Sequence, residues 1–127
     1  MNYYCKILIK APIKINELSK KISSFLNLDF DKFLSSKNDI LSIDIQKNKE
    51  FDEIESQEFP DGFLFYPYFL DIDIIDENRI TQYKVVIKRL LEYLWEENYQ
   101  AVASCDFEED LPHKGGYNQM INKEIKL

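Results

Sequence analysis

The sequence predicts an α+β fold, a two-layer sandwich in which two helices cover one face of an antiparallel sheet. Apolar residues alternate in four segments and recur at helical spacing in two others, in the order β-α-β-β-α-β. That order is typical of ferredoxin-like sandwiches. The 127 residues, 45% hydrophobic and 31% charged, suffice for one core. We therefore expect a single domain over residues 1–127, with residues 106–127 as an irregular C-terminal tail.

The first half of the chain predicts two strands and a helix. Residues 3–9 alternate as a strand does, and Pro12 ends the strand because it cannot donate to a sheet. Asn16 is a candidate cap for a helix whose apolar residues continue at helical spacing to Asn27. Residues 28–37 show no clear period. Residues 40–46 alternate again and predict the second strand.

The second half predicts two more strands around a second helix. Residues 47–61 are polar and acidic, which favours a long connection or a frayed strand pair. Residues 63–75 are the strongest strand candidate, and a helix over residues 80–95 follows, capped by Asp76 or Asn78. Asn98 is a plausible stop for this helix, and residues 99–107 predict the last strand.

Alternation within residues 63–75 assigns side chains to the two faces of the sheet. One face, expected under the helices, carries Leu64, Tyr66, Tyr68, Leu70, Ile72 and Ile74. The other face is expected to be open or covered only by the tail. It carries Tyr4, Lys6, Asp44, Phe65, Phe69, Asp71 and Asp73. This open face therefore mixes aromatic side chains with carboxylates.

The negative charge is concentrated in one stretch of the chain. The whole sequence has 23 acidic and 16 basic residues, a net charge of −7. Residues 44–78 hold eleven acidic and two basic residues, whereas the remainder holds twelve and fourteen. Such a balance argues against a protein that grips a phosphate backbone. It is typical of a solvated acidic loop, or of a surface that attracts a basic protein partner.

The motifs that bear on chemistry favour no catalytic site. Asp71, Asp73 and Asp76 lack the glycine turn of a calcium loop, so no metal site is expected. A nucleophilic pair of Cys105 and His113 is disfavoured by the carboxylates around the cysteine. Residues 62–68 resemble the aromatic strand of RNA-recognition motifs, but the surrounding acidic residues would repel phosphates.

The ends and the cysteines predict a soluble cytoplasmic protein. The N-terminal apolar stretch is too short for a signal-peptide core, and no small-residue cleavage site follows. Two cysteines, Cys5 and Cys105, cannot make a disulfide framework, and in the cytosol they are expected to be reduced, buried thiols.

A resemblance points to one class of binding protein. Residues 101–112 (AVASCDFEEDLP), followed by Gly115-Gly116-Tyr117, resemble the C-terminal end of small bacterial immunity proteins of contact-dependent inhibition and related polymorphic toxin systems. The resemblance implies a protein that blocks a toxin. Many such toxins are nucleases with basic clefts, which an acidic inhibitor can occupy.

These observations favour an immunity protein that neutralises a basic toxin domain, without enzymatic activity, cofactor, metal or membrane partner. The residues expected to bind the partner are Asp52, Glu53, Glu55, Glu58, Phe65, Phe69, Asp71 and Asp73. The alternative acidic patch is Asp106, Glu108, Glu109 and Asp110. Three other functions stay open: a small enzyme or ligand-binding protein, an RNA-recognition-like domain, and a subunit of a homo-oligomer.

Overall fold

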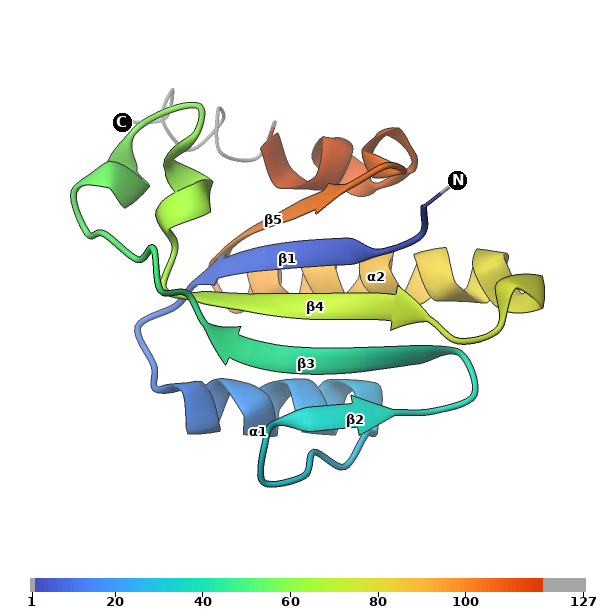
Figure 1. Ribbon diagram of the computed structural model, residues 1–127. Helices are drawn as coiled ribbons and strands as arrows, with labels where there is room; N and C mark the ends of the chain where they lie inside the picture. The colour runs from blue at the N-terminus through green and yellow to red at the C-terminus, as the bar shows by residue number, and fades with distance from the viewer. Residues whose placement is uncertain (1, 118–127) are drawn as a thin grey trace.

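The computed structural model describes residues 2–117, which form one five-stranded sheet and two α-helices (Figure 1). The strands are β1 (Cys5–Lys10), β2 (Ser35–Lys37), β3 (Leu41–Lys47), β4 (Tyr68–Ile74) and β5 (Gln100–Cys105), and the helices are α1 (Ile15–Leu26) and α2 (Ile80–Glu96). The strand order is β2-β3-β4-β1-β5, and every neighbouring pair is antiparallel. The α+β sandwich is confirmed. The sheet has one strand more than expected, because the unassigned region 28–37 contributes β2 at an edge.

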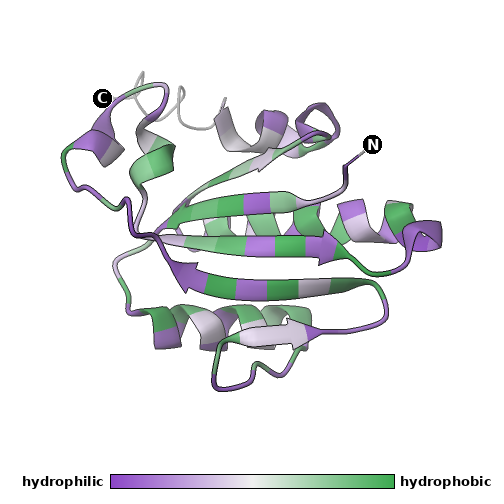
Figure 2. Cartoon of the chain, in the orientation of Figure 1, coloured by the Kyte–Doolittle hydropathy of each residue, from purple (hydrophilic) through white to green (hydrophobic). Residues whose placement is uncertain are grey.

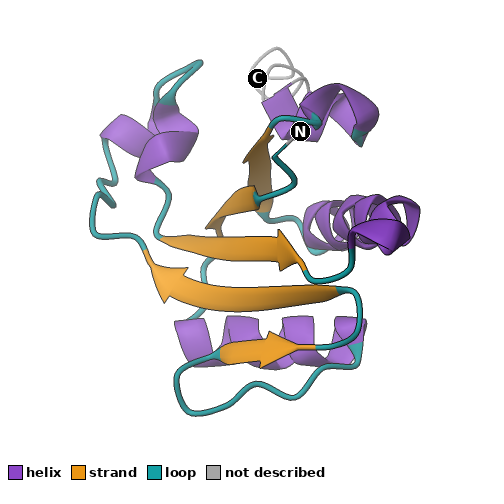
Figure 3. Cartoon of the chain, turned by 45° about the vertical axis from the view of Figure 1, so that its right-hand side comes forward, coloured by secondary structure: helices purple, strands orange, loops and turns teal. Residues whose placement is uncertain are grey.

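Both helices pack on the same face of the sheet and share one core with it. In Figure 1 the sheet is seen from the other face, with α2 running behind β1 and β4, and Figure 3 shows the same arrangement turned by 45°. The strands and helices contribute fully buried residues to this core, among them Ile7, Ile43, Leu70, Leu18, Ile22, Ile87 and Leu90. Alternation along the strands therefore assigned this face correctly for β1, β3 and β4.

The helix ends follow the sequence signals in part. Helix α1 begins at Ile15 after Lys14, which makes no side-chain cap, so the expected cap at Asn16 is wrong. The carboxylate of Asp76 accepts a hydrogen bond from the amide of Asn78 (3.0 Å), at the short 3-10 helix Glu77–Arg79 that leads into α2. After α2, Asn98 takes the left-handed conformation (φ 65°), as a helix stop does.

The strand expected over residues 63–75 is correct only from Tyr68 onward. Gly62–Phe65 forms a 3-10 helix, and Pro67 precedes the first residue of β4. Phe63 and Tyr66 turn to the sheet face opposite the helices and form a second buried cluster with Leu8 and Val102. The expectation that Leu64 and Tyr66 share a face with Leu70 is therefore wrong, because the strand period does not apply before Pro67.

Because of this second cluster, the sheet face opposite the helices is not open along its whole length, as had been expected. One end of that face is covered by the chain between β3 and β4, which is a long connection and not a strand pair. The remaining part of the face carries the polar residues of β1, β3 and β4, visible as purple bands on the strands in Figure 2.

Residues 106–117 pack along the free edge of β5. They form the 3-10 helices Glu108–Asp110 and Pro112–Gly116. A Cβ atom on Gly116, whose φ is 115°, would lie 2.4 Å from the carbonyl oxygen of Ala101, so this close approach requires glycine. The indole nitrogen of Trp95 donates to the same oxygen (3.0 Å). Residues 118–127 of the expected tail lie outside the described residues.

Neither helix within residues 2–117 has the length and apolar character needed to cross a membrane.

Candidate protein-binding surface

The connection between β3 and β4 is strongly acidic. We name residues 50–61 the acidic loop: it has six acidic residues and no basic residue. It also exposes apolar side chains, since Phe51 is 45% exposed, Ile54 74% and Phe59 44%. Leu64, just after the loop, is 48% exposed. Carboxylates and exposed apolar side chains thus occur together on one segment.

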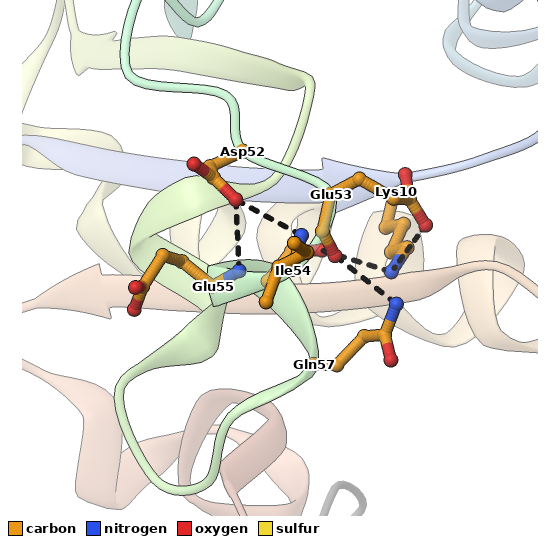
Figure 4. Close-up of polar contacts among 7 residues, drawn as sticks. Lys10, Asp52, Glu53, Ile54, Glu55 and Gln57 are labelled. Carbon is orange, nitrogen blue, oxygen red and sulfur yellow. Dashed lines mark hydrogen bonds and ion pairs between the residues drawn. The ribbon is translucent and has the colours of Figure 1, made fainter.

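Side chains within the acidic loop and from β1 hold its conformation (Figure 4). A carboxylate oxygen of Asp52 accepts hydrogen bonds from the amides of Ile54 (2.9 Å) and Glu55 (3.0 Å), at the start of the 3-10 helix Glu55–Gln57. The ammonium of Lys10 donates to the hydroxyl of Ser56 (3.0 Å) and lies 3.7 Å from a carboxylate oxygen of Glu53. Asp52 and Glu53 therefore shape the loop as well as charging it.

Hydrogen bonds within the connection hold the base of the loop together, and Phe63 packs it on the sheet. The side-chain amide of Asn48 donates to the carbonyls of Leu64 (3.0 Å) and Tyr66 (2.7 Å). The amide of Gly62 donates to the carbonyl of Glu58 (2.8 Å). Phe63 lies in the second cluster, and its ring meets that of Tyr117 edge-on, with ring centroids 5.1 Å apart. The loop is therefore anchored at both sides and by an apolar contact beneath it.

Two of the expected binding residues stay available for a partner. Glu55 and Glu58 are exposed, and their carboxylates make no hydrogen bond or ion pair within residues 2–117. Ile54, the most exposed apolar residue of the loop, precedes Glu55. A basic partner with an apolar contact point would meet both kinds of side chain on this loop.

The sheet residues of the expected site form a separate group. Asp71 is engaged: the hydroxyl of Tyr4 donates to one of its oxygens and the amide of Gln46 to the other (3.1 Å). Burial and this carboxylate raise the pKa of the Tyr4 hydroxyl well above its usual range. Phe69 is half-buried with the ammonium of Lys6 4.3 Å from its ring centroid, whereas Asp73 is exposed.

The structure thus divides the expected site between the loop and the sheet. Asp52, Glu53, Glu55 and Glu58 lie together on the acidic loop, whereas Phe69, Asp71 and Asp73 lie along β4. Phe65 does not belong to β4, because it ends the 3-10 helix Gly62–Phe65 and is half-buried.

Four residues of this surface were not expected from the sequence: Ile54 and Leu64 as exposed apolar contacts, and Lys10 and Asn48 as anchors. A lone apolar residue inside an acidic stretch was the available signal for Ile54. Nothing local signals Lys10, because its contacts with the loop span distant parts of the chain.

The alternative acidic patch is partly used within the fold. The ammonium of Lys84 donates to a carboxylate oxygen of Asp110 (2.9 Å). A carboxylate oxygen of Glu108 accepts from the amide of Cys105 (3.1 Å). Asp106 and Glu109 are exposed.

Cys105, His113 and the aromatic segment 62–68, which the sequence offered for other chemistries, have the following neighbours. His113 lies edge-on to Trp95, with ring centroids 5.6 Å apart, while Cys105 is paired across the sheet with Cys5. Phe63 and Tyr66 are buried, so the aromatic segment 62–68 is no flat platform for stacked bases. Within residues 2–117 no three acidic, cysteine or histidine side chains gather as metal ligands would.

A groove of about 760 Å³ lies between the end of β1, the start of α1 and the acidic loop. Its lining includes Lys10, Glu17, Phe51, Glu53 and Tyr68. The hydroxyl of Tyr68 donates to the carbonyl of Ile13 (2.6 Å), which ties the wall of this groove to the segment before α1. The groove therefore adjoins the acidic loop and shares Phe51 and Glu53 with it.

Comparison of the chain with protein-family models, with curated proteins and with solved structures gives no match.

Proposed function

We propose that this chain is an immunity protein that binds and neutralises a cognate toxin through its acidic loop, the toxin being a domain with a basic substrate cleft. One observation carries the proposal: a loop with six acidic and no basic residues is anchored to the sheet and presents exposed Ile54 beside exposed carboxylates. Carboxylates raise the rate of encounter with a basic surface, and apolar contacts slow dissociation. An anchored loop also loses less conformational freedom on binding than a free one.

The loop and the sheet residues have different parts in this proposal. Glu55 and Glu58, whose carboxylates make no hydrogen bond or ion pair within residues 2–117, attract the toxin, and Ile54 provides the apolar contact. Asp52 and Glu53 keep the loop in shape. Phe69, Asp71 and Asp73 extend the surface along β4, and of these Asp73 is the exposed charge.

The test compares two variants with the same change in charge. In the first, Glu55→Lys and Glu58→Lys reverse the loop; in the second, Glu92→Lys and Glu96→Lys reverse two acidic residues of α2. Each is co-produced with a candidate basic toxin domain taken from the reading frames next to this gene, and bacterial growth is measured. The proposal expects the wild type and the α2 variant to protect, and the loop variant to fail. Equal protection by both variants, with both folded by circular dichroism, would contradict it.

Two finer statements belong with this proposal. We infer a ferredoxin-like sandwich with β2 added at its edge, which is supported by the order β3-β4-β1-β5 of the other strands. We also infer a cytoplasmic protein, since a toxin that acts on nucleic acid must be met there.

The groove beside the acidic loop favours ligand binding as a second candidate function. Its volume of about 760 Å³ falls in the usual range of small-molecule sites. Turnover of a substrate by the purified chain, lost on Tyr68→Ala and kept in the Glu55→Lys, Glu58→Lys variant, would favour this candidate over the binding protein.

A further inference from the structure

The two cysteines lie opposite one another in neighbouring strands. Strands β1 and β5 pair antiparallel, and Cys5 is the direct partner of Cys105 in that register. Residues in direct opposition have Cα atoms about 4.5–5.5 Å apart, within the range of about 4.4–6.8 Å that a disulfide requires. Their side chains leave the same face of the sheet, and the two thiols share a hydrogen bond. The strands therefore hold both sulfur atoms in place before any reaction.

The two thiols differ in access and in acidity. Cys5 is fully buried, whereas Cys105 is partly exposed. Hydrogen bonds from the Cys5 thiol and from the amide of Phe107 lower the pKa of Cys105. The hydrogen bond shared with Cys105, together with burial, raises the pKa of Cys5. Cys105 is thus the sulfur atom that a dissolved oxidant meets, and Cys5 is the buried neighbour that can complete a disulfide.

We propose that Cys5 and Cys105 form an oxidisable dithiol, a modification site that a small hydroperoxide converts into a cross-strand disulfide. It goes beyond the proposed function, because both sulfur atoms lie on the helix side of the sheet, away from the acidic loop.

The reaction needs only the two thiols and one hydroperoxide, here hydrogen peroxide. The Cys105 thiol first releases its proton, and the resulting thiolate attacks one peroxide oxygen. An S–O bond forms, the O–O bond breaks, and the departing hydroxide takes up the released proton as water. The sulfur atom of Cys5 then attacks that of Cys105. An S–S bond forms, the S–O bond breaks, and the departing oxygen leaves with the Cys5 proton as a second water molecule. Both sulfur atoms are oxidised and both peroxide oxygens are reduced.

The disulfide would join the first strand to the end of the last one. Because the closed ring contains nearly the whole described chain, the disulfide restricts the unfolded state strongly. It also fixes the residue from which the segment 106–117 departs. Oxidation should therefore raise the urea concentration at the midpoint of unfolding.

The test uses the purified full chain, first reduced and then treated with hydrogen peroxide. Free thiols are alkylated, and the intact mass and the linked peptides are measured by mass spectrometry. We expect a monomer that has lost two hydrogen atoms, with Cys5 and Cys105 linked, and that regains both thiols with dithiothreitol. Two thiols that both remain open to alkylation would overturn the proposal. A disulfide between two molecules, or added oxygen on Cys105 beside a free Cys5 thiol, would overturn it equally.

Variants and a denatured control make the test specific. In Cys5→Ala, Cys105 should stop at the sulfenic acid, which dimedone traps; in Cys105→Ala, Cys5 should stay a thiol in the folded protein. The intramolecular disulfide should form about tenfold or more faster in the native chain than in urea, because the sheet positions both sulfur atoms. Equal rates in the native and denatured wild type would contradict the proposal even if neither variant folds.

Discussion

The contact between Phe63 and the sheet should decide whether the acidic loop keeps its shape. Phe63 is 5% exposed in the second cluster, and its ring meets Tyr117 edge-on. Transfer of a phenylalanine side chain out of water contributes about 1.5–3 kcal/mol. The cavity that truncation leaves brings the loss for Phe→Ala to about 3–5 kcal/mol. The cluster lies at the edge of the fold, where the residues above it can move into the cavity. We therefore expect Phe63→Ala to lose about 3 kcal/mol of stability.

Phe59→Ala is the matched control, because Phe59 belongs to the acidic loop but is 44% exposed. We expect this variant to lose less than about 1 kcal/mol. Urea unfolding, followed by the fluorescence of the single tryptophan Trp95 and by circular dichroism, measures both losses. Hydrogen exchange at the amide of Gly62, which donates to Glu58, should accelerate in Phe63→Ala and not in Phe59→Ala. Equal losses, or equal exchange at Gly62, would refute the view that Phe63 anchors the loop.

Three further predictions concern the packing around this framework. Gly116→Ala should destabilise the protein by about 2 kcal/mol or more, measured by urea unfolding, since its Cβ would meet the carbonyl oxygen of Ala101 at φ 115°. Tyr83→Phe should cost about 1–2 kcal/mol in the same assay, because the hydroxyl that donates to Tyr3 (2.6 Å) is lost from a buried site. Burial raises the pKa of Tyr117 from 10.0 to about 12, so its contribution to stability is complete below pH 10 and is lost as the pH rises to 12. Tyr117→Phe should therefore show a smaller fall in stability over that range; an unchanged pH profile would count against it.

Periodicity predicted most of the fold because most of the strands follow it. In β4, Leu70 and Ile72 face the helices while Asp71 faces away, as strict alternation requires. The same reasoning fails before Pro67, where four apolar residues form a 3-10 helix and Phe63 packs on the opposite face. An apolar run in a sequence is compatible with a strand and with a turn. Here the tertiary contact of this segment with Leu8 and Val102 decides between them. The sequence of the short strand β2 shows no clear alternation of apolar residues. Its register is set by pairing with β3.

The candidate site was predictable in its charge and not in its arrangement. The net charge of a segment does not depend on its conformation. The acidic character of the region around Glu55 and Glu58 could therefore be counted from the sequence. The sequence could not tell that Asp71 is engaged by Tyr4, because that contact joins two strands far apart in the chain. The opposition of Cys5 and Cys105 is hidden for the same reason, as it depends on the register between the first and last strands.

The most direct measurement of the central claim is the salt dependence of association between this chain and the proposed toxin partner, followed by surface plasmon resonance. The account predicts a rate constant that falls steeply with ionic strength, and a rate about tenfold lower at low salt in the Glu55→Lys, Glu58→Lys variant. The variant with Glu92→Lys and Glu96→Lys should associate like the wild type. A salt-independent rate, or the same rate in both variants, would contradict the claim that the acidic loop recognises its partner.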